Sequence, residues 1–458
     1  MPGLVQGSLW LIHEKEGSDR MAFRHLPGLA ITAIIALSTA AFADEPCKAP
    51  GAWFPQIAKS DVDALFAKRP PGDAECDFYQ WAYATFLYVT QNDTGSTPRF
   101  RGYKSFTELF DKPLSVASAA PKAHLLNLTP RVLKQASSVN DFDGVAQAGL
   151  SGVLVDQIGF PIYYAMHFND DFVNFMTSNG FLDKNKLKNI SPATDKNFPT
   201  GTLELKSAWR IKPDNISEAE FRQNYIAVDA QIPGLKEATD SHGRKTVVAD
   251  PDHPKTVLAG LIGLHVVGVI EGHPEFVWAS FEHRKNAPNG MRGVDPSSSN
   301  PVDQVADWLL YKQGTSYRGS NPTPGTFDLS LKPDGTVAPS TSVYRVYPSG
   351  DEAEDEDPQV KDLNGSVQAQ LSPGSVISNY KMIGAVWLGQ GDGAFGPGLT
   401  FSDDLLQGEK QLSNMSMESF TQVKEPNCFS CHNTKASSGM PESRLNVSHS
   451  VIKFVQSP

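Results

Sequence analysis

The sequence predicts an α+β protein with an antiparallel, β-rich core, preceded by helices and followed by a short segment of different character. Two observations predict this class. Helical periodicity is confined mainly to the early part, whereas from residue 152 onward short apolar runs are rich in β-branched and aromatic residues. Helices interrupt these runs irregularly, without the strand–helix alternation of a parallel sheet. We therefore expect a helical region over 44–150, a β-rich core over 151–412 and a distinct segment over 413–458.

The individual elements follow from local patterns. Two helices are expected before the core, at 61–68 and 76–91, and the second carries aromatic and aliphatic residues along most of its length. The expected strands are 152–156, 161–167, 203–211, 225–232, 257–270, 276–283, 343–347 and 380–388. Short helices are expected between them at 171–179, 218–224 and 302–312. The stretch 286–301, rich in Pro, Asn, Gly and Ser, predicts a long loop.

Residues 1–43 have the pattern of an export signal. A short basic start at Met21 precedes an apolar run over 29–37 and a small-x-small triplet ending at Ala43. Residues 1–20 do not fit this order, so we interpret Met21 as the initiator. The apolar run is shorter than the ~20 residues that span a bilayer. We expect cleavage after Ala43 and a periplasmic protein without a stable membrane anchor.

Four cysteines are present, and two of them, Cys47 and Cys76, lie far from the others. In an oxidising compartment such a pair more often forms a structural disulfide than a reactive site. The sequence therefore predicts a Cys47–Cys76 disulfide that ties the early chain to the helix beginning near Cys76.

The other two cysteines belong to Cys428-Phe429-Ser430-Cys431-His432, the most specific chemical signal in the chain. Two thiols three positions apart can add to the two vinyl groups of one porphyrin, and the adjoining His can reach the iron as proximal ligand. A redox dithiol and half of a zinc site are alternatives, but there is no second Cys pair nearby and no βαβ pattern. The motif predicts one covalently bound haem c.

The position of this motif restricts the fold. A small cytochrome c domain carries its motif near the start, whereas here 26 residues follow His432. So short a segment does not cover a haem, so the preceding β-rich core is expected to form the pocket. Helical-bundle cytochromes carry a late motif, but the strand-rich middle of this chain does not fit a bundle. We therefore expect neither of these two folds.

Several blocks of this chain resemble a large bacterial group known as cytochrome c family proteins. These blocks are the residues 76–81, 154–157, 263–267, 278–283 with 286–288, and the final Cys-x-x-Cys-His. The resemblance spans nearly the whole chain after residue 43. It implies a periplasmic protein with one haem and does not imply a particular reaction.

The second axial position on the iron decides what the haem does. His265, within an apolar strand, and His283, at a strand end, are the favoured candidates for the haem pocket, as distal ligand or distal acid or base. His449 is the next candidate, because the short C-terminal tail can fold it over the haem. Further candidates are Met440, after the motif, and Met415 and Met417, before it.

Three functions remain open. An electron-transfer cytochrome has a six-coordinate iron held by His432 and a second Met or His. A haem-dependent oxidoreductase has an open or displaceable sixth site, where Glu282 or Arg284 could assist a distal His in polarising peroxide or another small oxidant. A sensor or binding protein uses the haem without turnover. Coordination of the iron distinguishes the three.

The net charge of −11 disfavours nucleic acid and anionic membranes as partners and mildly favours a basic redox partner. Two local features carry less information. The acidic run 351–357 lacks the ordered ligand spacing of a calcium loop and predicts a solvated loop. The glycine-rich stretch 389–393 lacks the following helix that a nucleotide site requires.

Overall fold

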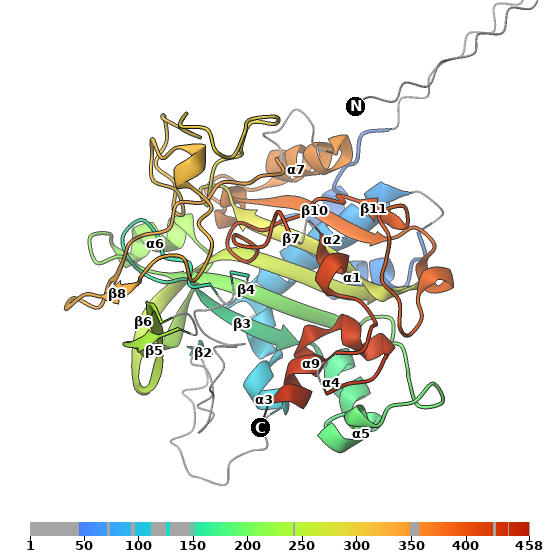
Figure 1. The fold of residues 1–458 in the computed structure, drawn as a ribbon. Coiled ribbons are helices and arrows are strands. Elements are labelled where there is room, and N and C mark those ends of the chain that lie inside the picture. The colour runs from blue at the N-terminus through green and yellow to red at the C-terminus, as the bar shows by residue number, and fades with distance from the viewer. Residues whose placement is uncertain are drawn as a thin grey trace, which may run out of the picture. The chain divides into compact units, whose positions relative to one another are not determined.

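A single large antiparallel sheet organises the chain (Figure 1). The computed structural model describes residues 45–70, 74–92, 97–110, 125–128, 148–149, 152–240, 243–348, 357–424, 427–437 and 439–457. Along the sheet the strand order is β1-β3-β4-β6-β7-β10-β11. Their bounds are β1 Lys104–Ser105, β3 Tyr163–Phe168, β4 Leu203–Ile211, β6 Lys245–Ile270, β7 His273–His283, β10 Tyr380–Leu388 and β11 Leu406–Gly408. The predicted α+β, β-rich class is confirmed at this level.

The long strand β6 belongs to two parts of the sheet. Its second half lies between β4 and β7, and its first half pairs with β5 (Ala227–Thr239) in a long hairpin. The two-residue strand β2 (Leu126–Asn127) adds to β5 in parallel. Strands β8 (Ser330–Leu331) and β9 (Val337–Ala338) form a small separate ladder.

Alternation along the strands gives the sheet two different faces. On β4, Leu203, Leu205 and Trp209 belong to the main core, whereas Glu204 and Lys206 point to the opposite face. Strands β6 and β7 alternate in the same way, because side chains of successive strand residues leave the sheet on opposite sides. One face is therefore apolar, and the other carries charged groups.

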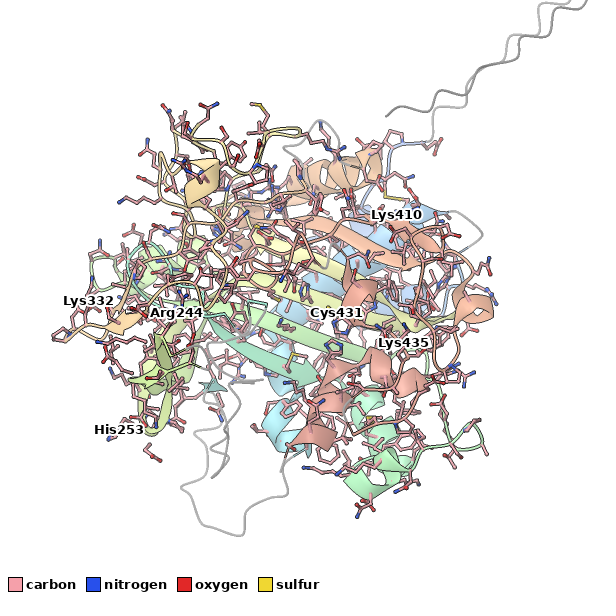
Figure 2. The ribbon with its side chains drawn as sticks, viewed as in Figure 1. Arg244, His253, Lys332, Lys410, Cys431 and Lys435 are labelled. Carbon is pink, nitrogen blue, oxygen red and sulfur yellow. A yellow bond between two sulfur atoms is a disulfide. The ribbon has the colours of Figure 1, made fainter. Side chains whose placement is uncertain are left out.

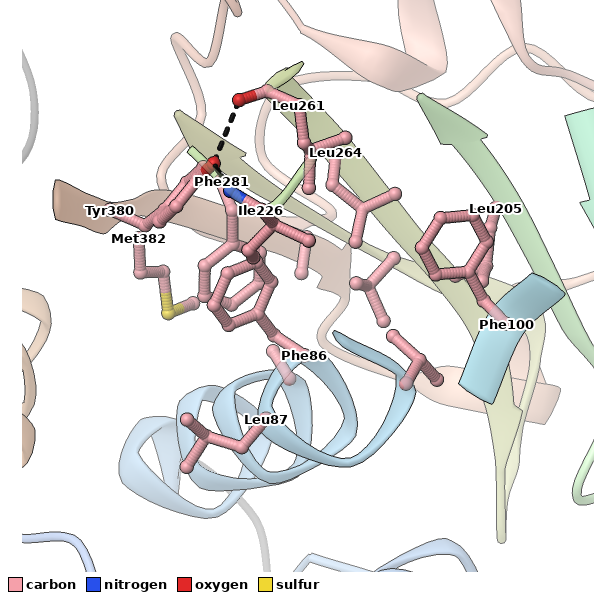
Figure 3. Packing of buried hydrophobic residues seen from close by; sticks show 14 of the residues in the cluster. Phe86, Leu87, Phe100, Leu205, Ile226, Leu261, Leu264, Phe281, Tyr380 and Met382 are labelled. Atoms are coloured by element: carbon pink, nitrogen blue, oxygen red, sulfur yellow. Dashed lines mark hydrogen bonds between the residues drawn. The ribbon is translucent and has the colours of Figure 1, made fainter. Parts of the chain in front are cut away.

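Helix α2 (Glu75–Thr90) covers the apolar face. Its Phe86 stacks on Phe281 of β7 with ring centroids 4.2 Å apart, and Figure 3 shows both rings within the cluster of buried side chains. The Tyr380 hydroxyl donates a hydrogen bond to the Leu261 carbonyl at 2.8 Å, which satisfies a polar group inside this core. Helices α1 (Lys59–Phe66) and α7 (Pro358–Gln370) pack against α2.

The C-terminal segment, residues 427–457, packs on the opposite face of the sheet. It contains α8 (Cys428–Cys431) and α9 (His449–Gln456), and α9 contacts α5 (Lys184–Lys188). Phe454 of α9 stacks on Phe110 of α3 (Phe106–Phe110), with centroids 4.8 Å apart. The remaining helices are α4 (Asp170–Ser178), beside this cluster, and α6 (Glu218–Asn224).

Most expected elements agree with the structure to within a few residues, but β5 and β6 extend well beyond the expected 225–232 and 257–270, and three expected elements do not form. The range 302–312 is not helical, because the Asp303 carboxylate accepts hydrogen bonds from the Val305 and Ala306 backbone N–H groups and so competes with helix formation. Ranges 152–156 and 343–347 contribute isolated bridges rather than strands, and the predicted loop over 286–301 is confirmed. Residues 46–458 form one compact unit, which contains parts of all three expected regions.

The expected disulfide is present between Cys47 and Cys76, at the first turn of α2. We expect the double variant Cys47→Ala/Cys76→Ala to lower the free energy of unfolding by ~2–5 kcal/mol, because the unfolded chain gains the freedom that the closed loop removes. Denaturant titration of the oxidised wild type and the variant measures this difference. Equal midpoints would contradict a stabilising role.

A partly buried acidic cluster joins α2, α7 and the segment after β11. The Tyr79 hydroxyl donates to the Asp357 carboxylate, and the Asp357 backbone N–H donates to Glu409 at 2.9 Å. Burial raises the pKa of Glu409 to about 7, and the nearby Asp357 carboxylate adds to this rise, against the hydrogen bond from the Asp357 N–H. The folded protein therefore binds a proton at Glu409 at pH values where the unfolded chain has released it.

The raised pKa of Glu409 determines the direction in which stability changes with pH. Stability is expected to fall as the pH rises from about 4.5 to about 7, by ~2–3 kcal/mol, because ionising Glu409 costs more in the folded state. The Glu409→Gln variant should remove this part of the dependence, while Glu220→Gln on the exposed surface of α6 should leave it unchanged. Unfolding free energies measured at pH 4.5, 6 and 7.5 test the expectation, and parallel curves for wild type and Glu409→Gln would contradict it.

Two sets of sequence expectations lie outside the described residues. They are the export signal over 1–43 and most of the acidic run, 351–356. Within the described residues, no helix combines the length and apolar character needed to cross a bilayer.

Candidate haem-attachment site

The Cys-x-x-Cys-His motif forms one helical turn, α8. The Asn427 side chain accepts a hydrogen bond from the Ser430 N–H at 3.0 Å and caps this turn, and the His432 N–H donates to the Cys428 carbonyl at 2.8 Å. Residues three apart on a helix share a face, so the turn brings both thiols to the same side. Neither cysteine forms a disulfide, and Cys431, labelled in Figure 2, is exposed.

The motif borders a cavity of about 360 Å³ between the C-terminal segment and the charged face of the sheet. Strand register explains which residues face it. Lys206 of β4 pairs with His265 of β6, and Glu204 pairs with Val267, which in turn pairs with Trp278 of β7. The lining residues are Gly149, Met166, Glu204, Lys206, His265, Val267, Trp278, Ala279, Leu412, Met417, Glu418, Thr421, Asn427, Cys428, Cys431, His432 and His449.

The His432 imidazole has a defined orientation. Its Nδ1 lies 2.9 Å from the Val447 carbonyl oxygen. Because a carbonyl only accepts, Nδ1 carries the proton, and Nε2 is left with the lone pair that a metal binds. Burial lowers the pKa of His432 well below its usual value, and the neighbouring His449 acts in the same direction. The ring is therefore neutral at pH 7, as a metal ligand must be.

Two rings hold this imidazole from its sides. Trp278 lies 4.0 Å away between ring centroids and His449 lies 3.9 Å away, both at moderate tilt. Two rings this close do not fit on one face of an imidazole, so His432 lies between them. The Trp278 indole N–H is buried and finds no hydrogen-bond partner among the described residues.

The floor of the cavity is polar. His265 Nε2 lies 2.9 Å from a Glu418 carboxylate oxygen, and the other Glu418 oxygen accepts from the Asn414 N–H at 2.9 Å. Burial alone raises the pKa of Glu418, but the charges and hydrogen bonds of His265, Lys206 and Asn414 outweigh it and lower that pKa. Burial lowers the pKa of Lys206, while Glu418 opposes this effect. An imidazole, a carboxylate and an amine thus meet beside the motif.

The predicted distal candidates occupy different places. His265 and His449 line the cavity, as does Met417. The His449 ring stacks on His432, and its Nε2 lies 3.1 Å from the Cys431 carbonyl oxygen. This arrangement places His449 beside the predicted proximal ligand, whereas a residue that bound the iron from the opposite side would be separated from His432 by the porphyrin.

The remaining candidates lie outside the cavity lining. His283 stacks on Tyr225 with centroids 4.5 Å apart, and its Nε2 faces the Asn224 carbonyl at 3.1 Å. Met440 and Met415 are buried in apolar clusters. Glu282 and Arg284 also lie outside the lining, and Glu282 forms a buried ion pair with Arg345.

Sequence reasoning missed Glu204, Lys206 and Glu418. For two of these, Glu204 and Lys206, the sequence contains a pattern that could have identified them. In the strand Leu203–Ile211, leucines at 203 and 205 alternate with charges at 204 and 206, and both sets are inside the protein. Charged residues that alternate with core residues on a central strand indicate either a solvated face or a polar cavity. Glu418 lies in an irregular segment and gave no such signal.

The cavity and its lining fit a covalently attached haem. This group requires two thiols outside any disulfide on one face of a helical turn, a neutral imidazole with an oriented Nε2 and a largely apolar wall. Burial raises the pKa of the Cys428 thiol well above its usual value, which is the opposite of a reactive redox dithiol. Among the described residues, no group of three or more His, Cys, Asp and Glu side chains is placed to hold a metal ion directly.

Comparisons of this chain with protein-family models, with curated proteins and with solved structures gave no match.

Proposed function

We propose that this chain is an exported c-type cytochrome with one haem, held by Cys428 and Cys431 and ligated by His432. The observation that carries the proposal is the hydrogen bond from His432 Nδ1 to the Val447 carbonyl, beside a cavity that Cys428 and Cys431 both border. Bound haem supplies a one-electron ferric/ferrous couple. The resemblance to bacterial cytochrome c family proteins and the predicted export signal agree with this proposal.

The residues around the motif suit electron transfer. Cys431 is exposed, so one edge of the attachment site meets the surface where a partner can approach. The aromatic rings on both sides of His432 restrict motion of the imidazole between oxidation states. The net charge of −11 favours a basic redox partner in the periplasm.

One observation favours a second function, a haem-dependent oxidoreductase acting on peroxide or another small oxidant. His265 and Glu418 share a hydrogen bond within the cavity, with Lys206 next to them. A His–carboxylate pair can hold a proton at His265 Nε2 and deliver or accept it during chemistry. Because Nε2 is already bonded to Glu418, His265 fits an acid–base role better than that of an axial ligand.

Optical spectroscopy tests both functions. The full chain is produced in a host with cytochrome c maturation and recorded oxidised, reduced, and reduced with carbon monoxide. A covalent, low-spin haem that is indifferent to carbon monoxide supports electron transfer. A high-spin haem that binds carbon monoxide supports the oxidoreductase. Absence of covalent haem under these conditions contradicts the proposal, and the same chain from a host without maturation is the control.

A further inference from the structure

A buried carboxylate on the sheet contacts the segment that holds His432. Glu204, on β4, is 5% exposed, and its two oxygens accept hydrogen bonds from the Ser448 hydroxyl at 2.7 Å and the Ser450 hydroxyl at 2.6 Å. Both serines are fully buried. Burying a carboxylate is costly unless both oxygens are hydrogen-bonded, so these two contacts are what makes Glu204 tolerable at this position.

The two serines are chain neighbours of two residues that contact His432. Val447, next to Ser448, provides the carbonyl for His432 Nδ1, and His449, between the serines, provides the stacked ring. His449 Nε2 also faces the Cys431 carbonyl at 3.1 Å, within the motif itself. Glu204 thus fixes the start of α9 to the sheet, and the start of α9 fixes the imidazole from two directions.

We infer that Glu204, through Ser448 and Ser450, is a positioning residue for the proximal haem ligand, with Val447 and His449 as the groups that contact the imidazole. The inference rests on the proposed function, because it concerns the ligand of the haem. A hydrogen bond to the outer nitrogen of a ligating His fixes its tautomer and ring orientation and tunes the metal. Residues 447–450 then hold the proximal ligand in place, and we call them the proximal clamp.

The Glu204 carboxylate fixes the positions of two particular hydroxyl groups, which filling the space at residue 204 does not require. An apolar residue at 204 would fill the sheet face without the cost of burying a charge, but it would not fix two particular hydroxyls. The rest of the segment is anchored elsewhere, since Ser443 donates to Asp195 at 2.8 Å and Arg444 pairs with the same carboxylate at 3.1 Å. That second anchor is a matched serine–carboxylate contact on the same segment.

The experiment compares variants of the haem-loaded chain by the electron paramagnetic resonance spectrum of the ferric haem and by its midpoint potential. Ser448→Ala/Ser450→Ala and Glu204→Leu should replace one ferric species with several and shift the midpoint potential, because the imidazole is no longer held in one orientation. Glu204→Gln keeps two polar atoms for the serines and should stay close to wild type. Ser443→Ala, at the other anchor, should leave both readouts unchanged.

A second pair of variants tests the clamp without altering the buried carboxylate. His449→Phe retains a ring against His432 and should preserve a single ferric species, whereas His449→Ala should not. If Glu204→Leu does not fold, these two variants still test whether the proximal clamp holds the imidazole in one orientation. The inference is overturned if all variants give wild-type spectra, or if Ser443→Ala changes the spectra as much as Glu204→Leu does. Either result leaves the proposed function intact. A wild-type chain without covalent haem overturns both.

Discussion

Replacing both motif cysteines, in the variant Cys428→Ala/Cys431→Ala, is expected to abolish covalent haem in a host with cytochrome c maturation. Each thioether bond needs one cysteine sulfur, and the only cysteines besides the motif pair, Cys47 and Cys76, are joined to each other. The measurement is haem staining of the denatured protein, in which only covalent haem remains with the polypeptide. Loss to background is the expected result.

The variant should still fold, which makes the result interpretable. Cys431 is exposed and Cys428 is only partly buried, so removing the two sulfurs is expected to cost about 1 kcal/mol, the central value for point mutations. The matched control is Cys47→Ala/Cys76→Ala, which removes two other sulfurs and should lower stability while retaining haem. Haem retained by the motif variant, or lost equally by both, would refute covalent attachment at Cys428 and Cys431.

Most strands of the sheet could be predicted from the sequence, because their residues either alternate between apolar and polar or form continuous apolar stretches. The bounds expected for Leu203–Ile211 and Tyr380–Leu388 agree with the structure, since both strands are buried along almost their whole length. The first half of β6 was missed, because the polar residues at 250–255 do not look like a strand. They belong to β6 because β5 pairs with the strand on both sides of them, through Asp250 opposite Gly234 and Lys255 opposite Ile232.

The candidate site could be predicted from the sequence only in part. The motif itself is local, so its spacing alone identified Cys428, Cys431 and His432. The residues that contact His432 are Val447, Trp278 of β7 and His449 of α9. No local pattern predicts these contacts, or that Glu204 of β4 lies against serines more than 200 residues later. His283 looked equivalent to His265 in sequence, but His265 pairs with Ser280 of β7, three residues from His283. Because successive side chains alternate between faces, that odd step puts His283 on the opposite face of the sheet from the cavity. Register, which is a tertiary property, decided between them.

The two charged pairs on this face of the sheet have different consequences. Glu418 and His265 border the cavity and remain partly exposed within it. Glu282 and Arg345, by contrast, are 1% and 2% exposed and join at 2.7 Å. Glu282 also accepts from the Met415 N–H at 2.6 Å, so this pair ties β7 to the segment that leads into the cavity wall. The first pair is available for chemistry, whereas the second supports structure.

Replacing Arg345 with Met is therefore expected to cost ~3–5 kcal/mol of unfolding free energy, because it leaves the Glu282 carboxylate buried without its counter-ion. The exposed pair Lys59–Asp63, at 2.6 Å, provides the control, and Lys59→Met should cost ~1 kcal/mol or less. Denaturant unfolding of the three proteins at one pH measures both values. Adding Glu282→Gln to Arg345→Met should recover part of the loss, since the amide carries no charge to bury. A cost below that of Lys59→Met, or no recovery in the double variant, would show that the loss does not arise from an uncompensated buried charge.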